Sequence, residues 1–217
     1  MTTDIFIKTH SADWQYHEYC MKSIEKFCKG FRKTVVVEGE HRNGYFWQQV
    51  VKMHADHYTD ADMILVTDSD SLFQEHVTPE SFMRDGKPIW LITPYTPEMM
   101  KHAGMQAWFR VMTKFCGVEP TFEYMRRQPF MLPSRLLKEF RAFCIKQHGR
   151  TLQQYIMESN EFSEYNAFAH YCYLHHHDEF CWINTEEELP PLLVRQFWSH
   201  APLSENIVEI ESILSKP

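Results

Sequence analysis

Short apolar runs alternate with amphipathic segments through the first seventy residues. Apolar or β-branched runs at 4–9, 34–37 and 63–67 predict buried strands. Between them, residues 14–28 and 46–58 place apolar side chains three to four positions apart, which predicts two amphipathic helices. Strands and helices that alternate at this spacing are typical of an α/β fold with a mostly parallel central sheet flanked by helices.

The second half of the chain is richer in helix signals. Thr96, Ser134 and Ser163 each precede an apolar face with helical spacing, so we expect them to cap three helices, the first ending near Cys116. A terminal helix is expected after an irregular stretch at 185–203. Further extended segments are expected at 88–93, 127–132 and 180–183.

Composition narrows the class of protein. The 217 residues suffice for one well-packed domain, and no linker, repeat or low-complexity tract divides them. With only 7 glycines the chain contains neither GxGxxG nor GxxxxGK[ST], which argues against Rossmann oxidoreductases and P-loop kinases. The net charge of −7 disfavours nucleic acid as a partner without excluding it, because phosphate contacts usually need a basic face.

The expected location is the cytoplasm. Asp4 and Lys8 interrupt the first apolar stretch, so we expect no secretory leader, and no run approaches the roughly 20 apolar residues of a membrane span. The six cysteines are dispersed and form no CxxC pair, which favours reduced, buried thiols.

The main candidate for chemistry lies where the third predicted strand ends. There the apolar run 64–67 leads into Asp68-Ser69-Asp70, which places two carboxylates at the carboxyl edge of the sheet. Neighbouring carboxylates repel each other, so the pair needs a metal ion or strong hydrogen bonds. Oxygen ligands suit Mg²⁺ or Mn²⁺, which can bridge the phosphates of a nucleotide diphosphate. The alternative interpretation is an acidic turn that follows a strand.

This stretch resembles the DxD motif of GT-A glycosyltransferases. Residues 44–52 (GYFWQQVVK) are similar to the gWxQQxxK helix of a family of small bacterial and phage glycosyltransferase-like proteins, and residues 162–166 (FSEYN) resemble its fSEY segment. Residues 5–13 resemble the first strand and loop, which cradle the nucleotide in GT-A enzymes. The order and spacing of these segments cover most of residues 4–170. Thr67 departs from the pattern, since many relatives carry another Asp or a hydrophobic residue there.

The resemblance implies a single Rossmann-related, GT-A-like domain over residues 1–217. Residues 4–93 would form the half that binds the nucleotide sugar and the metal, and residues 94–217 the acceptor half with a metal-ligand loop near its end. The implied reaction transfers a sugar from a nucleotide-diphosphate sugar, with a UDP-sugar expected ahead of a GDP-sugar, to a hydroxyl group. The acceptor stays open among glycans, small molecules, proteins and hydroxymethylated pyrimidines in phage DNA.

The donor site implied by the resemblance combines the first loop, the QQxxK helix and the motif itself. An ammonium there would pair with phosphate, and amides with sugar hydroxyls. Alternatively, Ser11 is a helix N-cap with Asp13 in the first turn, and the QQxxK residues lie on an exposed helix face. The expected donor-binding residues are Thr9, His10, Ser11, Asp13, Gln48, Gln49, Lys52, Asp68 and Ser69.

Three further positions complete the implied site. His200 would join Asp68 and Asp70 as a metal ligand, which favours Mn²⁺ over Mg²⁺; alternatively it lies on the surface of the tail. Glu164 and Asp70 are the candidate catalytic residues, with Glu164 as the base; alternatively Glu164 compensates a helix dipole. The turn that carries Arg126, Arg127 and Gln128 would form part of the acceptor site or hold a phosphate; alternatively it is a solvated basic turn.

Two other classes of function fit the same residues. A nucleotidyltransferase also holds Mg²⁺ between paired carboxylates and phosphates, and it would release pyrophosphate. A non-catalytic sugar- or nucleotide-binding module would bind the ligand and turn nothing over.

Overall fold

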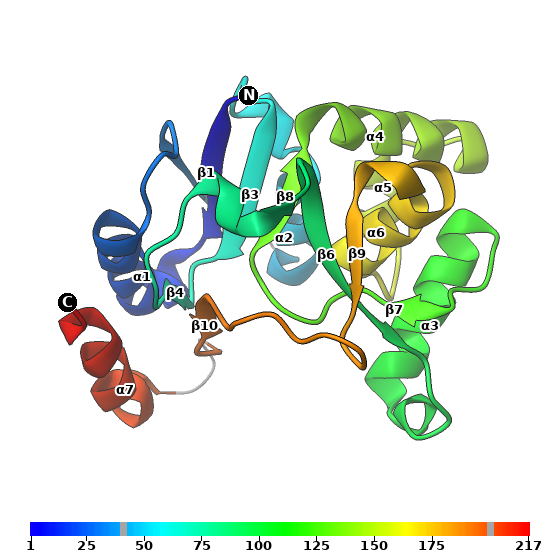
Figure 1. Ribbon diagram of the computed structural model, residues 1–217. Helices are drawn as coiled ribbons and strands as arrows, with labels where there is room; N and C mark the ends of the chain where they lie inside the picture. The colour runs from blue at the N-terminus through cyan, green and yellow to red at the C-terminus, as the bar shows by residue number, and fades with distance from the viewer. Residues whose placement is uncertain (40–42, 199–201) are drawn as a thin grey trace.

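The computed structural model describes residues 1–39, 43–198 and 202–217, and its centre is a four-stranded sheet (Figure 1). The order is β2 (Thr34–Glu38), β1 (Thr3–Thr9), β3 (Met63–Asp68) and β8 (Phe130–Pro133). β1 pairs in parallel with β2 and β3, and β8 pairs antiparallel with β3. The predicted α/β class with a mostly parallel sheet is therefore confirmed.

The remaining strands of the described residues form a separate two-stranded sheet and a separate four-stranded sheet. β4 (Ser71–Phe73) pairs antiparallel with β10 (Val194–Gln196). β6 (Lys87–Pro94) pairs in parallel with β9 (Cys181–Asn184) and antiparallel with β5 (Met83–Arg84) and β7 (Phe122–Glu123). The expectation that residues 185–203 are irregular is wrong at β10, because a three-residue strand is too short to produce a periodic pattern.

Seven helices surround the strands in the described part of the chain. They are α1 (Trp14–Phe27), α2 (Gly44–Lys52), α3 (Ala103–Cys116), α4 (Ser134–His148), α5 (Leu152–Met157), α6 (Glu164–His175) and α7 (Leu203–Ser215). Single 3₁₀ turns occur at η1 (Ser11–Asp13), η2 (Ala55–His57), η3 (Pro79–Phe82), η4 (Met99–Lys101) and η5 (His177–Glu179).

The end of α2 and the start of α3 differ from the sequence prediction. α2 ends at Lys52, and the η2 turn takes up the rest of the apolar pattern that extends to residue 58. The Thr96 hydroxyl accepts the Met99 N–H at 3.2 Å in the segment that leads into η4, while the extended backbone of His102 delays α3 until Ala103. The Thr96 cap therefore precedes a single 3₁₀ turn, η4, and the α-helix itself begins later.

The serines predicted to cap α4 and α6 also form other hydrogen bonds than expected. Ser134 is the first residue of α4 rather than its N-cap, and its hydroxyl donates to the carbonyl of Ala61. Ser163 is the N-cap residue of α6, but its hydroxyl accepts from the Asn166 side chain at 3.0 Å and caps no backbone N–H. Both hydroxyls bond outside the backbone ladder of their own helix.

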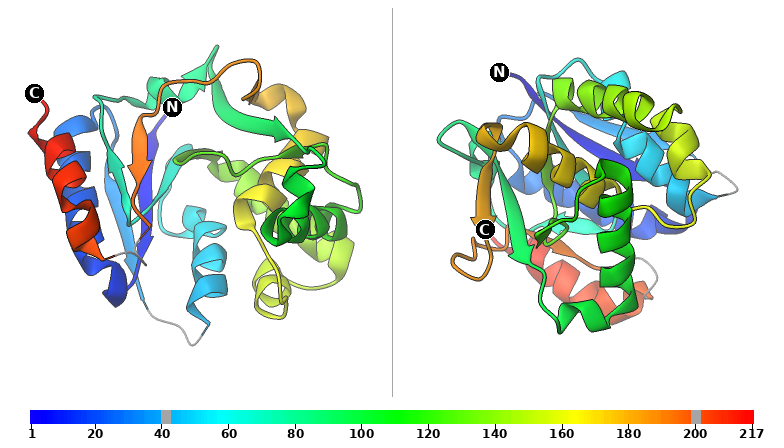
Figure 2. Two further views of the ribbon diagram at one scale, coloured as in Figure 1. Left: turned by 90° about the horizontal axis from the view of Figure 1, so that it is seen from below. Right: turned by 90° about the vertical axis from the view of Figure 1, so that its right-hand side faces the viewer.

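The central sheet is buried on both faces. Ile5 and Ile7 pack into one core with α1 and α7, whereas Phe6 points into the other core, which α2 and α4–α6 cover. Figure 2 shows α1 and α7 on one side of the sheet and the remaining helices on the other. Because both faces are covered, the strands read as continuous apolar runs instead of alternating ones.

All six cysteines are unpaired, four of them buried and two half-buried. Among the described residues, no helix combines the length and the apolar character needed to cross a bilayer.

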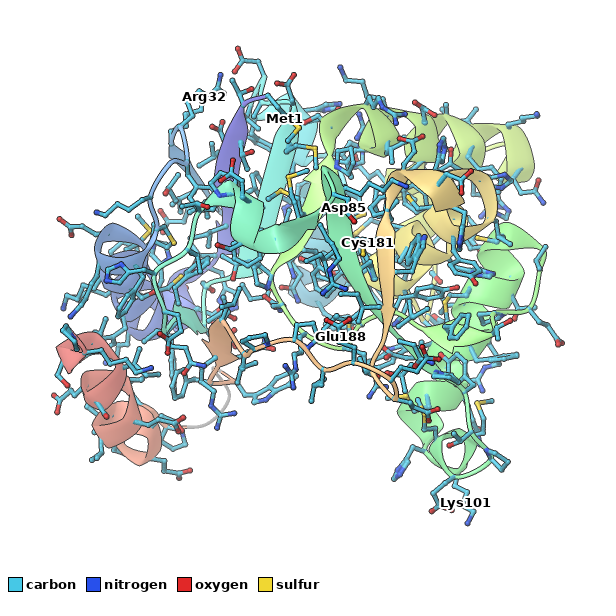
Figure 3. The ribbon with its side chains drawn as sticks, viewed as in Figure 1. Met1, Arg32, Asp85, Lys101, Cys181 and Glu188 are labelled. Atoms are coloured by element: carbon cyan, nitrogen blue, oxygen red, sulfur yellow. The ribbon has the colours of Figure 1, made fainter. Side chains whose placement is uncertain are left out.

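A buried ion pair stabilises the end of the sheet where β1 begins. Asp4 is fully buried and accepts from Arg32 Nε at 2.9 Å and from Arg32 Nη2 at 2.7 Å, with a further bond from the Thr59 hydroxyl. Burial by itself would raise the pKa of Asp4, but the bonds from Arg32 and Thr59 outweigh it and hold the pKa below its usual value. Figure 3 shows Arg32 and Met1 at this end of the molecule.

Replacing Arg32 with methionine should lower the urea concentration at the midpoint of unfolding at neutral pH, because Asp4 then stays buried without a cation. Since folding lowers the pKa of Asp4, the stabilisation is present above about pH 4 and is lost as the pH falls further. Urea unfolding at a series of pH values should show a difference in midpoint between wild type and Arg32→Met that narrows in acid. Lys22→Met, in an exposed pair with Glu18, is the control and should leave the midpoint close to that of wild type; equal losses would contradict the prediction.

Candidate active site

A cleft of about 480 Å³ opens where β1 and β3 end. The two strands are parallel, so their carboxyl ends meet at one edge of the sheet, where open α/β sheets bind ligands. The other walls come from α2, α3, the loop before β8, the start of α6 and the end of β10. The lining residues are Lys8, His10, Asp13, Tyr45, Gln48, Gln49, Lys52, Asp68, Ser69, Asp70, Trp108, Met125, Arg126, Arg127, Gln128, Phe130, Ser163, Glu164, Tyr165, Gln196 and Trp198.

The two motif acids face this cleft from a tight turn. Asp68 is the last residue of β3, in register with Lys8 of β1, and Asp70 directly precedes β4. Pairing of β4 with β10 brings Gln196 to the motif, where its Nε2 lies 3.3 Å from Asp68 Oδ2 and 3.2 Å from Asp70 Oδ1. The two carboxylates therefore converge on one donor atom, as two ligands of a single cation must.

The donor set fits a hard divalent cation, although the described residues do not complete a coordination shell. Carboxylate oxygens are preferred ligands of Mg²⁺ and Mn²⁺. Within residues 1–39, 43–198 and 202–217, no group of three or more His, Cys, Asp or Glu side chains is arranged to hold a metal ion. The predicted third ligand, His200, lies outside the described residues.

Lys52 connects the motif to α6. Its ammonium lies 2.6 Å from Asp68 Oδ1 and 3.2 Å from Glu164 Oε1, and its side chain is 4% exposed. Burial alone would lower the pKa of Lys52, but the neighbouring Asp68, Tyr165 and Glu164 raise it well above its usual value. Burial also raises the pKa of Glu164, against the opposing effect of Lys52. One buried cation thus serves two carboxylates from different elements.

The first loop contributes His10 and Asp13 to the cleft. His10 Nε2 lies 3.1 Å from Asp13 Oδ2, which also accepts from the Ser69 hydroxyl at 3.2 Å. Thr9 is buried and does not line the cleft, and Ser11 lines only an adjoining hollow of about 500 Å³. The alternative interpretation of Ser11 as an N-cap is wrong, because His10 is the N-cap of η1 and accepts the Ala12 N–H at 3.2 Å.

The three predicted residues of α2 all line the cleft. Gln48 also lines the adjoining hollow, so the two spaces lie next to each other along this helix. Gln49 and Lys52 are 1% and 3% exposed. The alternative of an exposed helix face is therefore wrong for these two residues.

The loop before β8 supplies the predicted acceptor residues. Arg127 Nη1 donates to the Pro190 carbonyl at 2.8 Å, and Arg126 pairs with the buried Glu123. Gln128 uses its amide on Asp68: Oε1 accepts the Asp68 N–H at 2.8 Å, and Nε2 donates to the Asp68 carboxylate. The turn faces the cleft with its side chains already bonded to protein atoms, which does not fit a solvated basic turn.

Several lining residues were missed from the sequence. A lysine at position 8 inside an apolar strand was a usable signal, because a buried charge needs a functional or structural partner. Trp108 looked like an ordinary member of an amphipathic helix. Gln196 and Trp198 fall in the stretch expected to be irregular and gave no signal. Trp198 is 59% exposed and adopts a φ of 50°, a left-handed conformation that is uncommon for a residue with a side chain.

Comparison with known proteins places the chain among proteins of glycosyltransferase fold. A galactosyltransferase, LgtC, solved with donor and acceptor sugar analogues, aligns with a TM-score of 0.53 at 10% identity, over 99% of this chain and 97% of that one. A glycosyltransferase involved in glycosylation of the major capsid of PBCV-1 aligns with a TM-score of 0.54 at 10% identity, over 98% and 100%. At this identity the likeness shows a shared fold.

A family model built from sequences also matches most of the chain. The chain belongs to a family of unknown function, DUF6492, whose model matches residues 6–199. No curated protein matches the chain significantly.

Replacing Lys52 with methionine should destabilise the protein by about 3–5 kcal/mol, because Asp68 and Glu164 lose their shared cation. The double variant Lys52→Met/Glu164→Gln should recover part of this loss, which urea unfolding in a double-mutant cycle would measure. Lys101→Met is the control, since Lys101 is exposed, does not line the cleft and lies at the lower edge of the molecule in Figure 3. A cost for Lys52→Met no greater than that of the control would show that the pair contributes little.

Proposed function

We propose that this protein is a metal-dependent glycosyltransferase of the GT-A type. It would transfer a sugar from a nucleotide-diphosphate sugar, preferably a UDP-sugar, to an acceptor hydroxyl. The observation that carries the proposal is the convergence of Asp68 and Asp70 on one point inside a cleft at the carboxyl edge of the sheet. The shared fold with two glycosyltransferases supports it.

Asp68, Asp70 and His200 are the proposed ligands of Mn²⁺ or Mg²⁺. When bound, the ion would stabilise the negative charge that develops on the leaving nucleoside diphosphate. Trp198 lines the cleft two positions before His200, and the Phe197 N–H donates to the Asp70 carbonyl at 2.9 Å. The backbone is therefore bonded to the motif at Phe197, three positions before His200 in the sequence.

The donor would occupy the cleft and the adjoining hollow together. Lys8, His10, Tyr45 and Gln48 line both spaces, whose volumes are about 480 and 500 Å³. Ligand sites for small molecules typically measure about 300–1,000 Å³. We assign the nucleoside to the adjoining hollow, and the diphosphate and the sugar to the cleft beside Asp68 and Asp70. The assigned donor residues are Thr9, His10, Ser11, Asp13, Gln48, Gln49, Lys52, Asp68 and Ser69.

Glu164 is the proposed general base. It opens α6, lines the cleft and has a raised pKa because it is buried. A base works best when its pKa approaches the operating pH, and burial moves Glu164 in that direction. Glu164 therefore would accept the proton of the attacking hydroxyl, with Arg127 on the acceptor side of the same cleft.

Ligand binding and product analysis together test this proposal. A thermal-shift panel of UDP- and GDP-sugars, with and without Mn²⁺, should show stabilisation that depends on both components. Saturation at a hundredfold excess over Kd corresponds to about 2.7 kcal/mol. Release of nucleoside diphosphate with a transferred or hydrolysed sugar would support transfer. Release of pyrophosphate from a nucleoside triphosphate would identify a nucleotidyltransferase, and binding without turnover would identify a non-catalytic module.

Asp70→Asn should abolish Mn²⁺-dependent binding of UDP while the protein stays folded. The change removes one anionic ligand and keeps the size of the side chain. Isothermal titration with UDP, with and without Mn²⁺, measures the effect, and the exposed Asp178→Asn is the matched control. Equal affinities of wild type and Asp70→Asn in both conditions would remove Asp70 from the metal site.

Glu164→Gln should lower the turnover of the UDP-sugar by roughly 10²–10⁴-fold and leave donor affinity nearly unchanged. The amide keeps the shape of the carboxylate but cannot accept the proton. Release of UDP during sugar transfer to water gives the rate without a known acceptor, and Glu119→Gln on the surface is the control. Turnover close to wild type would leave Glu164 with the role of compensating the dipole of α6.

A further inference from the structure

The side chain of Gln128 forms two hydrogen bonds with Asp68. Its carbonyl oxygen accepts the backbone N–H of Asp68 at 2.8 Å, and its NH₂ group donates to Oδ2 of the Asp68 carboxylate. The two groups sit on one planar amide, so together they fix the carboxylate relative to its own backbone. A single hydrogen bond would leave that orientation adjustable.

The remaining contacts of Asp68 add to this restraint. Gln196 Nε2 also donates to Oδ2, at 3.3 Å, while the Lys52 ammonium lies 2.6 Å from Oδ1. A carboxylate oxygen accepts about two hydrogen bonds. Gln128 and Gln196 therefore fill the acceptor positions of Oδ2, and among the described residues only Lys52 approaches Oδ1. Oδ1 is buried against the Lys52 ammonium, and Oδ2 is linked to Asp70 through Gln196, so the orientation of the carboxylate is fixed on both sides.

Gln128 itself is held by the loop that carries it. Glu123 is fully buried at the start of that loop, where it accepts the Met125 N–H at 2.7 Å and pairs with Arg126. At the other end, β8 pairs directly with β3 through Phe130 and Val66. The loop is thus anchored on both sides of Gln128, so the amide is presented to Asp68 from a constrained backbone.

We propose that Gln128 is a positioning residue for the first acid of the motif, not a residue that binds the acceptor. It orients Asp68 for a divalent cation and couples the acceptor-side loop to the metal-binding end of β3. This inference rests on the proposed function, since it assigns a role toward the same metal and donor. Neighbours that orient a metal ligand in this way typically change metal affinity by 10–100-fold when they are removed.

Gln128→Met tests the inference, because methionine has a similar length and makes neither bond. We expect the Kd for Mn²⁺, measured by electron paramagnetic resonance in the presence of UDP, to rise by about 10-fold or more. The melting temperature of each variant is measured in parallel. Gln153→Met, at an exposed position of α5, is the control and should bind Mn²⁺ like wild type. If Gln128→Met does not fold, Gln128→Asn keeps the amide but is too short to span both bonds, and it should show the same weakening.

The outcomes separate this inference from the function on which it rests. Wild type that binds no Mn²⁺ with UDP would overturn both. Wild type that binds Mn²⁺, together with an unchanged Kd in the Gln128 variant, would overturn the inference alone. A lower melting temperature with an unchanged Kd would show a purely structural role and would also overturn it.

Discussion

The shared ammonium of Lys52 is the interaction on which the geometry of the cleft depends. It joins Asp68 at the end of β3 to Glu164 at the start of α6, from a position on α2. Three elements that are distant in sequence therefore meet at one buried charge. A buried charge without a partner is costly, so the three groups stabilise one another only in this arrangement. Movement of any one element would leave at least one ion unpaired.

Burial of the central sheet on both faces supplies the frame for this cluster. β1 and β3 are sandwiched between two cores, which leaves their ends as the places where polar side chains can reach solvent. At the amino end, Asp4 is neutralised by Arg32. At the carboxyl end, Lys8, Asp68 and Asp70 line the cleft, and Asp68 is paired there with Lys52. The amino end of these strands thus holds a buried ion pair, whereas the carboxyl end borders a cleft that could admit a ligand.

Four amide side chains line the cleft. Gln48 and Gln49 come from α2, Gln128 from the loop before β8, and Gln196 from the end of β10. Amides can donate and accept without adding charge, so they can orient carboxylates while leaving the electrostatic balance unchanged. Gln128 and Gln196 act in this way on the motif acids. This arrangement suits a site that must hold two like charges close together until a cation binds.

The sequence by itself determined the elements and the position of the main motif. The strands at β1, β2 and β3 follow from apolar runs, and Asp68 had to lie at a sheet edge because it ends one of them. These features are local, so spacing alone reveals them. The resemblance to glycosyltransferases also pointed to Lys52 and Glu164 as members of one site.

Only the tertiary structure decided which partners those residues meet. Lys52 was expected to contact phosphate, and the structure adds that it lies between two carboxylates. Gln128 was expected near the acceptor, and its amide bonds to Asp68. Gln196 gave no signal because its position depends on the pairing of β10 with β4, more than 120 residues away along the chain. Such contacts depend on how elements dock, and neither periodicity nor motif spacing encodes the docking.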